Sequence, residues 1–385
     1  MYFEGGLSKS KIAMIKGVSK RFVIRWTQSL LQDVSVDDRG WPMGLRRKWT
    51  PQTEARIAII HADIEADPRA FYVGATAIEQ HWRRRWPHEP PPPIRTIGRI
   101  LRDMGLSKPN KAARRGASRY LCYPEHTVYN GIGDRMMEAD FVGQKFLTGS
   151  SMPLNFIGFS CKKSPKLRYY KRIQSQGAEE FIQCCRYVFD LLEKPHCIKV
   201  DNAAATIGSR SGKRNISKVM AFLLNNQVYP VFAVPRRPFS QASIEGNNSV
   251  FSRMFWNKRT FTSPEDVDLQ LEWFNQASLD YTAYHRPKEE TGHRSDFVPK
   301  VYFLRQVRSS TNGSDGWIEI MNETIRVPTC YINYFVFAQW HLIDECITVY
   351  IEKEKQLHTL LSLPFEINKT SRKKFEKCGA LSFGI

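Results

Sequence analysis

The order of apolar segments between residues 136 and 256 constrains the fold more than any other feature of the sequence. The segments expected as strands are Met136–Val142, Leu154–Ser160, Leu167–Ile173, Cys197–Val200 and Val228–Ala233. The segments with helical spacing of apolar residues are Ala178–Glu193, Ser217–Asn225 and a stretch from about Gln241 to Trp256. Three strands followed by alternating helices and strands predict an α/β domain built on a mixed sheet.

The chain on either side of this segment has different patterns. Helical patterns precede it at Ser8–Ile15, Lys20–Leu31, Glu54–Glu65, Thr76–Arg85 and Arg95–Met104. Short alternating strands, typical of a small β-barrel, follow it at Trp317–Met321, Thr324–Val327, Phe335–Trp340, Cys346–Ile351 and Leu357–Leu361.

These patterns predict a multidomain chain. We expect an all-α helix-turn-helix domain over residues 1–48 and a second helix-turn-helix or winged-helix domain over residues 49–120. A central α/β core is expected over residues 121–305, and a small β-barrel with a basic tail over residues 306–385. Because the β-rich part has no cluster of acids or thiols, we expect it to serve assembly or DNA docking. We also expect that its removal leaves the core folded.

The net charge indicates a nucleic-acid partner. The 385 residues include 57 Lys and Arg against 38 Asp and Glu, which gives a net charge of +19 at pH 7. Such an excess is expected of a chain that neutralises phosphates. Residues 1–130 alone hold 23 basic and 12 acidic side chains, so DNA contact is expected to be densest there. A solvated basic surface without a ligand is the alternative on charge alone.

One helical pattern in this basic region is suited to the major groove of DNA. Arg95, Arg99 and Arg102 lie on one side of the pattern at 95–104, and apolar residues at 97, 100 and 101 lie on the other. A recognition helix has this division into a basic and an apolar face. The alternative is a helix that packs on another domain and exposes its basic face to solvent.

Three acidic residues occur where the α/β pattern brings chain segments together. Asp140 lies within the first expected strand, Asp201 directly follows the fourth, and Glu245 lies early in the last core helix. Functional carboxylates gather at strand ends and on the helices beside them, and a carboxylate within an apolar strand is costly unless it is paired or bound to a metal. Such oxygen ligands suit Mg²⁺ or Mn²⁺. Structural ion pairs are the alternative role for these acids.

This arrangement resembles the catalytic core of DDE transposases from bacterial insertion sequences, which have a retroviral-integrase-type, ribonuclease H-like fold. The likeness covers residues 134–258. It rests on a carboxylate in the first strand, on Asp201-Asn202 after an apolar strand, and on the Glu-x-x-Asn motif at 245–248. The segment 235–241 is similar to the mobile loop that precedes the catalytic helix in that family. Ala203 departs from the glycine usual in the family, and the interval between the second and third carboxylates is longer than in the retroviral enzymes.

The resemblance implies a two-metal-ion polynucleotidyl transferase in which Asp140, Asp201 and Glu245 hold two Mg²⁺ or Mn²⁺ ions and act as catalytic residues. The residues expected to contact DNA are Arg95, Arg99, Arg102, Arg236, Arg237, Asn248 and Arg253. Such a transposase binds the terminal repeats of its element as double-stranded DNA, frees a 3′-hydroxyl by hydrolysis and joins it to target DNA, acting as a homo-oligomer. A ribonuclease H-like nuclease without joining activity and a catalytically inactive DNA-binding regulator are the alternatives.

Three further expectations follow from the sequence. The eight cysteines include no C-x-x-C pair, so neither a zinc module nor a disulfide framework is expected. No apolar run approaches the length of a membrane span, so a cytoplasmic protein without a membrane partner is expected; the resemblance implies that it is bacterial and nucleoid-associated. Glu138 shares a strand face with Asp140; we expect an exposed strand-end carboxylate, with assistance in metal binding as the alternative.

Overall fold

The structure is a computed structural model that describes residues 6–31, 49–107, 135–161, 167–208, 212–282, 297–309, 315–354 and 356–377. The chain divides into two units, residues 1–58 and residues 59–385. The boundary expected between residues 120 and 121 lies outside the described residues, as does residue 48 at the end of the first expected domain.

Two capped helices form the described part of the first unit, ahead of the start of α3. They are α1 (Lys9–Lys16) and α2 (Lys20–Leu31), both within a residue or so of the predicted positions. The Ser8 side chain accepts a hydrogen bond from the backbone N–H of Lys11, and Gly17 ends α1 in the left-handed region at φ 64°. Glycine adopts this conformation without steric cost, so it ends the helix.

Three further helices, α3 (Pro51–Ala66), α4 (Ala75–Arg85) and α5 (Ile94–Asp103), also confirm predicted helices. The apolar face of α5 is buried through Ile97, Ile100 and Leu101. The side chains of Arg95, Arg99 and Arg102 are exposed, so the predicted division of this helix into two faces is confirmed. None of the helices in the described ranges has both the length and the apolar character needed to cross a lipid bilayer.

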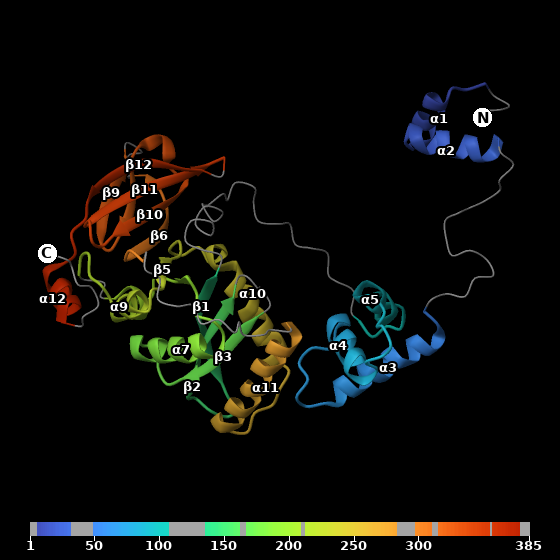
Figure 1. The fold of residues 1–385 in the computed structure, drawn as a ribbon, viewed down its shortest axis with the longest axis horizontal. Helices are drawn as coiled ribbons and strands as arrows, with labels where there is room; N and C mark the ends of the chain where they lie inside the picture. Colours follow the sequence, from blue (N-terminus) through green and yellow to red (C-terminus); the bar gives the residue numbers. More distant parts are fainter. Residues whose placement is uncertain are drawn as a thin grey trace. The chain divides into compact units, whose positions relative to one another are not determined.

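A mixed sheet organises the second unit. Among the described residues it has nine strands in the order β12-β11-β10-β6-β5-β4-β1-β2-β3 (Figure 1). The strands are β1 (Met136–Phe146), β2 (Pro153–Cys161), β3 (Arg168–Ile173), β4 (Cys197–Val200), β5 (Tyr229–Phe232), β6 (Lys300–Gln306), β10 (Phe335–His341), β11 (Cys346–Lys353) and β12 (Gln356–Pro364). The central strands β1, β4, β5 and β6 pair in parallel, and the other pairs are antiparallel.

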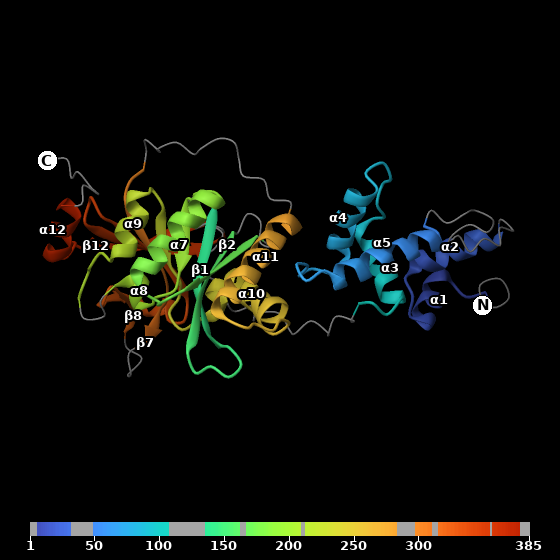
Figure 2. The same ribbon diagram turned by 90° about the horizontal axis from the view of Figure 1, so that it is seen from below.

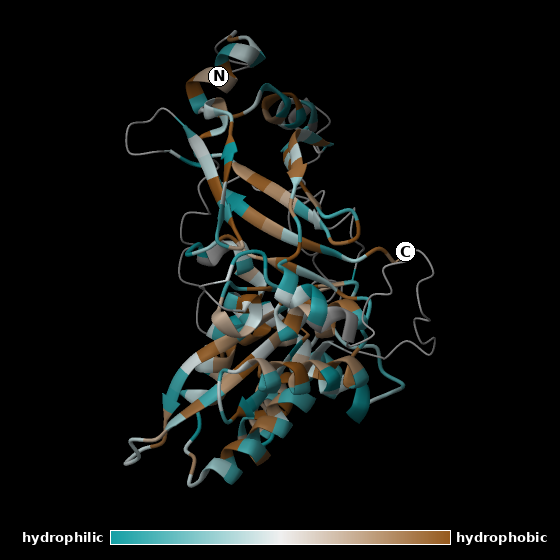
Figure 3. Cartoon of the chain, turned by 90° about the vertical axis from the view of Figure 1, so that its left-hand side faces the viewer, coloured by the Kyte–Doolittle hydropathy of each residue, from teal (hydrophilic) through white to brown (hydrophobic). Residues whose placement is uncertain are grey.

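Helices cover both faces of the central strands (Figure 2). On one face, α7 (Ala178–Leu191) and α9 (Lys218–Asn225) share a buried cluster with Met137 and Ala139 of β1. On the other face, η2 (Phe251–Trp256) and α11 (Pro264–Thr282) pack on Val142 of β1 and Phe156 of β2; α10 (Ala242–Val250) precedes η2. Hydrophobic segments lie on the strands (Figure 3), and β4, β5 and β6 are buried along nearly their whole length, as expected of strands covered on both faces.

The strands after residue 306 divide between this sheet and a small second sheet of β7 (Arg308–Ser309), β8 (Gly316–Ile320) and β9 (Glu323–Val327). The boundary expected between residues 305 and 306 falls within β6. Val336, Ala338 and Trp340 of β10 belong to the same buried cluster as Ile198 of β4. The expectation that the core folds without this part stays a prediction, and the shared cluster argues against it, because removal of β10 would expose one side of a continuous core. The expected basic tail forms α12 (Lys369–Lys377).

The remaining short helices connect these elements. They are α8 (Ala204–Ile207), η1 (Pro238–Gln241) and η3 (Thr329–Tyr331).

Helix α11, which was not predicted, covers the backbone of the edge strand β3. The side chain of Asn275 accepts from the Tyr170 N–H at 2.9 Å and donates to the Tyr170 carbonyl at 2.8 Å. The Ser278 hydroxyl accepts from the Arg168 N–H at 3.3 Å. An edge strand presents unpaired backbone groups that attract other chains, and α11 satisfies three of those of β3.

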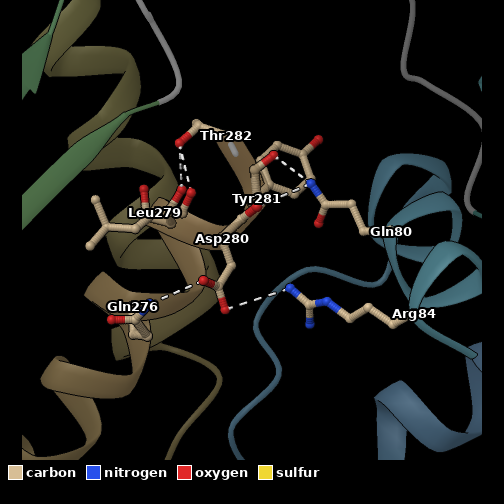
Figure 4. Close-up of polar contacts among 8 residues, drawn as sticks. Gln80, Arg84, Gln276, Leu279, Asp280, Tyr281 and Thr282 are labelled. Atoms are coloured by element: carbon tan, nitrogen blue, oxygen red, sulfur yellow. Dashed lines mark hydrogen bonds and ion pairs between the residues drawn. The ribbon is translucent and has the colours of Figure 1, made fainter. Parts of the chain in front are cut away.

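The α3–α4 loop and α4 contact α11 as well. The Gln80 side chain donates to the carbonyls of Asp280 and Tyr281 at 3.1 and 2.9 Å, and Arg84 lies 3.9 Å from the Asp280 carboxylate (Figure 4). Phe71 is 1% exposed, with its ring centroid 5.2 Å from that of Phe274. These contacts connect the segment that carries α5 to the helix that covers the sheet.

Replacing Asn275 with Ala should lower the free energy of unfolding by about 2–4 kcal/mol, because each buried backbone group left unsatisfied costs roughly 1–3 kcal/mol. The measurement is denaturant unfolding of the full chain. The control is Gln276→Ala on the exposed side of α11, which should change the free energy by less than about 0.5 kcal/mol. Equal effects of the two substitutions would contradict the role of Asn275.

Candidate active site

The parallel pairing of β1 with β4 brings the first two expected carboxylates to the same face of the sheet, near the carboxyl end of β4. Glu138 of β1 is the direct partner of Lys199 of β4, and Asp140 and Asp201 each follow two residues later. Side chains alternate between faces along a strand, so Asp140 lies on the same face as Glu138. For the same reason Asp201 lies on the same face as Lys199. This face is the one that α10 covers.

The three carboxylates line one pocket of about 1200 Å³. Asp140 comes from the middle of β1, Asp201 from the end of β4, and Glu245 from the fourth position of α10. Basic side chains line the same pocket, namely Arg236, Arg237, Arg305 and Arg308. The pocket therefore combines a group of acids with a basic wall, which suits a phosphodiester whose negative charge needs compensation.

Burial raises the pKa of each of the three pocket acids. Burial, together with the negative charges of Asp201 and Glu245, raises the pKa of Asp140 to about 7, although hydrogen bonds from the Phe141 N–H and from Asn248 act in the opposite direction. Burial also raises the pKa of Asp201, although the Ala203 N–H donates to its carboxylate at 3.1 Å. The pKa of Glu245 is raised by burial and then by the charge of Glu138. The charges of Asp201 and Glu245 thus disfavour ionisation of Asp140.

A hydrogen-bonded chain orients the Asp140 carboxylate. The Asn248 amide donates to Asp140 Oδ2 at 3.1 Å, and the Tyr170 hydroxyl donates to Asn248 Oδ1 at 3.0 Å. The Tyr170 ring passes over Gly158, the cross-strand partner of both Asp140 and Tyr170. A Cβ at this glycine would lie 2.5 Å from the ring, so only glycine leaves room for the Tyr170 ring in this position.

Substitution Gly158→Ala should destabilise the chain by about 1–3 kcal/mol through overpacking against Tyr170. The control is Gly143→Ala on β1, where an added Cβ has no atom within 4 Å and where stability should rise by about 0.4–1 kcal/mol. Thermal unfolding of both variants measures the difference. A neutral Gly158→Ala variant would show that the ring moves without cost.

Arg305 is a buried residue of the site that the sequence analysis did not find. Its guanidinium donates to Asn202 Oδ1 at 2.9 Å and to the carbonyls of Ala233 and Glu319 at 3.1 and 2.8 Å. Burial lowers the pKa of Arg305 to about 9, which leaves it charged at neutral pH. This residue joins the loop after Asp201 to the end of β5 and to β8. Arg305 lies on β6, a strand that the sequence pattern did not predict, so nothing in the sequence indicated that this arginine lies at the site.

Glu138 was expected to be exposed, and the structure contradicts this expectation. Its side chain is 1% exposed and its Oε1 lies 3.0 Å from the ammonium nitrogen of Lys199, which is also 1% exposed. Its Oε2 accepts from the Ile244 N–H at 2.9 Å. The prediction of an exposed carboxylate was wrong because α10 packs over this face of β1, and the local sequence does not reveal that packing.

The residues expected to contact DNA occupy three places in the described chain: the pocket, η2 and α5. Arg236, Arg237 and Asn248 are at or beside the pocket, whereas Arg253 is exposed on η2 and does not line it. The backbone of Arg236 lies in the left-handed region at φ 57°, an uncommon conformation for a residue other than glycine. Arg95, Arg99 and Arg102 are exposed on α5, as described above. The expected DNA contacts themselves remain predictions.

The donor chemistry of the pocket fits a divalent cation. The three carboxylates supply hard oxygen ligands, and a cation would relieve the repulsion that raises the pKa of Asp140. Among the described residues, no group of three His, Cys, Asp or Glu side chains lies close enough to form a complete ion cage. Mg²⁺ is usually held by one or two carboxylates together with water and substrate phosphates, so a complete cage is not required.

Comparisons with known proteins give weak structural similarities. No family model matches the sequence, and a search of curated proteins gives no match. A chain of the simian T-cell lymphotropic virus intasome is similar with a TM-score of 0.33 and 12% identity, covering 79% of this chain and 95% of that one. The catalytic core domain of BIV integrase is similar with a TM-score of 0.28 and 12% identity, covering 42% and 90%. Scores at this level do not establish a shared fold, so the functional argument rests on the pocket.

Proposed function

We propose that the chain is a DNA transposase, a metal-dependent polynucleotidyl transferase that cuts at the ends of an element and joins the freed 3′-hydroxyls to target DNA. The observation that carries the proposal is that Asp140, Asp201 and Glu245 line one pocket with arginines on its wall. The basic excess of the chain and the exposed arginines of α5 support DNA as the substrate. Action on paired ends requires a homo-oligomer on DNA.

The carboxylates would hold Mg²⁺ or Mn²⁺, which supplies activation of the attacking oxygen and stabilisation of the leaving oxygen of a phosphodiester. Asn248 and Tyr170 fix the orientation of the Asp140 carboxylate. Arg236 and Arg237 bind the phosphate backbone beside the carboxylates, because charge-assisted hydrogen bonds to phosphate are strong and directional. No covalent bond between protein and DNA is needed, since hydrolysis and joining are both in-line displacements at phosphorus.

Replacing Asp140, Asp201 or Glu245 with Ala should lower the rates of cleavage and of joining by about 10³-fold or more. DNA binding should stay nearly unchanged, because these side chains act in chemistry and not in recognition. The measurement is a gel assay of end cleavage and strand transfer with Mg²⁺, repeated with chelator, which should abolish both reactions. The control is Glu319→Gln, which changes a carboxylate that lines the same pocket and keeps the backbone carbonyl that Arg305 contacts. Strand transfer by Asp201→Ala at the unaltered rate would disprove the assignment.

The double variant Arg95→Ala/Arg99→Ala should weaken binding to element ends. If both arginines contact phosphates, the slope of log affinity against log salt should fall by about 0.9 for each contact. If they read bases, each should cost about 1–3 kcal/mol of discrimination against other sequences. Fluorescence anisotropy with end and random duplexes over a salt series separates these cases. Arg83→Ala, an exposed arginine of the neighbouring α4, is the control; unchanged end affinity and an unchanged slope in the double variant would refute the role of α5.

A further inference from the structure

One buried carboxylate connects the three elements that carry Asp140, Asp201 and Glu245. Glu138 lies two residues before Asp140 on β1, and its ion-pair partner Lys199 lies two residues before Asp201 on β4. Its second oxygen accepts from the N–H of Ile244, the residue before Glu245. Both of these contacts therefore lie within two residues of one of the acids in the pocket.

The contact with Ile244 takes the place of a helix cap. A helix begins with backbone N–H groups that have no partner within it, and a side chain just before the helix usually accepts from the second or third of them. Ile244 is the third residue of α10, and Gln241 at the N-cap position makes no such side-chain hydrogen bond. Glu138 supplies this acceptor from another element, and its negative charge also suits the positive end of the helix dipole.

Burial makes the arrangement specific. The side chains of Glu138 and Lys199 are each 1% exposed, so either charge without the other would be strongly unfavourable. Direct cross-strand partnership of the two residues fixes the register of β1 against β4, and with it the relative positions of Asp140 and Asp201. The hydrogen bond to Ile244 fixes the first turn of α10 against that pair of strands.

We propose that Glu138 is a positioning residue that sets the geometry of the three carboxylates by capping α10 from the sheet. This role rests on the proposed metal-dependent function. Glu138 itself does not touch the substrate or the ions, because α10 covers it and Lys199 occupies its other oxygen. Removal of a residue that orients metal ligands without binding the metal typically lowers metal affinity or activity by about 10–100-fold.

Two charge-neutral double variants of the full chain test the cap separately from the ion pair. Glu138→Gln/Lys199→Met keeps an oxygen within reach of the Ile244 N–H, whereas Glu138→Leu/Lys199→Met keeps none. Three quantities are measured: Mn²⁺ affinity by calorimetry without DNA, hydrogen exchange of the Ile244 amide, and the KM and kcat of strand transfer on pre-cleaved ends. The control is Arg172→Gln, which breaks the ion pair of β3 with Asp268 of α11.

In the leucine variant, Mn²⁺ affinity and kcat should each fall by about 10–100-fold, and exchange of the Ile244 amide should accelerate, with KM unchanged. The glutamine variant should stay close to the wild type in all three. Arg172→Gln should lower only the unfolding temperature. Equal Mn²⁺ affinity and equal Ile244 exchange in the two double variants would overturn the proposal.

If the leucine variant does not fold, Glu138→Asp takes its place. The shorter aspartate side chain keeps a negative charge beside Lys199 but does not reach the Ile244 N–H. This variant should lose Mn²⁺ affinity and Ile244 protection in the same way, and retention of both would overturn the proposal. The two failures are distinguishable. A wild-type chain that binds Mn²⁺ but neither cuts nor joins DNA contradicts the proposed function and leaves the binding and exchange results to decide the role of Glu138. A wild-type chain that binds no Mn²⁺ overturns both proposals.

Discussion

The parallel pairing of β1 with β4 is the constraint on which the rest of the site depends. This pairing makes Glu138 and Lys199 direct partners and places Asp140 and Asp201 one step further along the same face. A shift of register by one residue would turn these side chains to the opposite face, against the apolar cluster of α7 and α9. The pocket therefore exists because two strands distant in sequence are held in one register.

Buried charge is the second theme of the core, and two buried charged side chains have partners from more than one element. Arg305 reaches the loop after β4, the end of β5 and β8, and Glu138 reaches β4 and α10. Such groups contribute little net stability compared with apolar residues of the same shape, but the removal of one partner is costly. Their value here is geometric, since they fix the parts of the chain that carry the pocket acids.

The elements on either side of the central strands are integrated with them to an extent that the sequence did not indicate. Strand β6 pairs with β5 on one side and with β10 on the other, so the C-terminal strands enlarge the sheet of the core and contribute Arg305 and Arg308 to the pocket. On the opposite edge, α11 bonds to backbone groups of Arg168 and Tyr170 on β3 and also contacts Gln80 of α4. One helix thus stabilises the edge of the sheet and contacts the segment that bears α5.

The sequence by itself determined the local elements and the three acids. Helical or alternating spacing predicted α1 to α5, β1 to β5, α7 and α9, because the period of apolar residues follows directly from which face is buried. It missed α11, where buried Asn275 and Ser278 interrupt the apolar face, and β6, whose apolar residues Val301 to Leu304 form a run without alternation. It placed Glu138 wrongly and did not find Arg305. Only the tertiary structure decided these points, because burial of a charged side chain depends on partners that lie 61 and 103 residues away in the chain and not on its own neighbours.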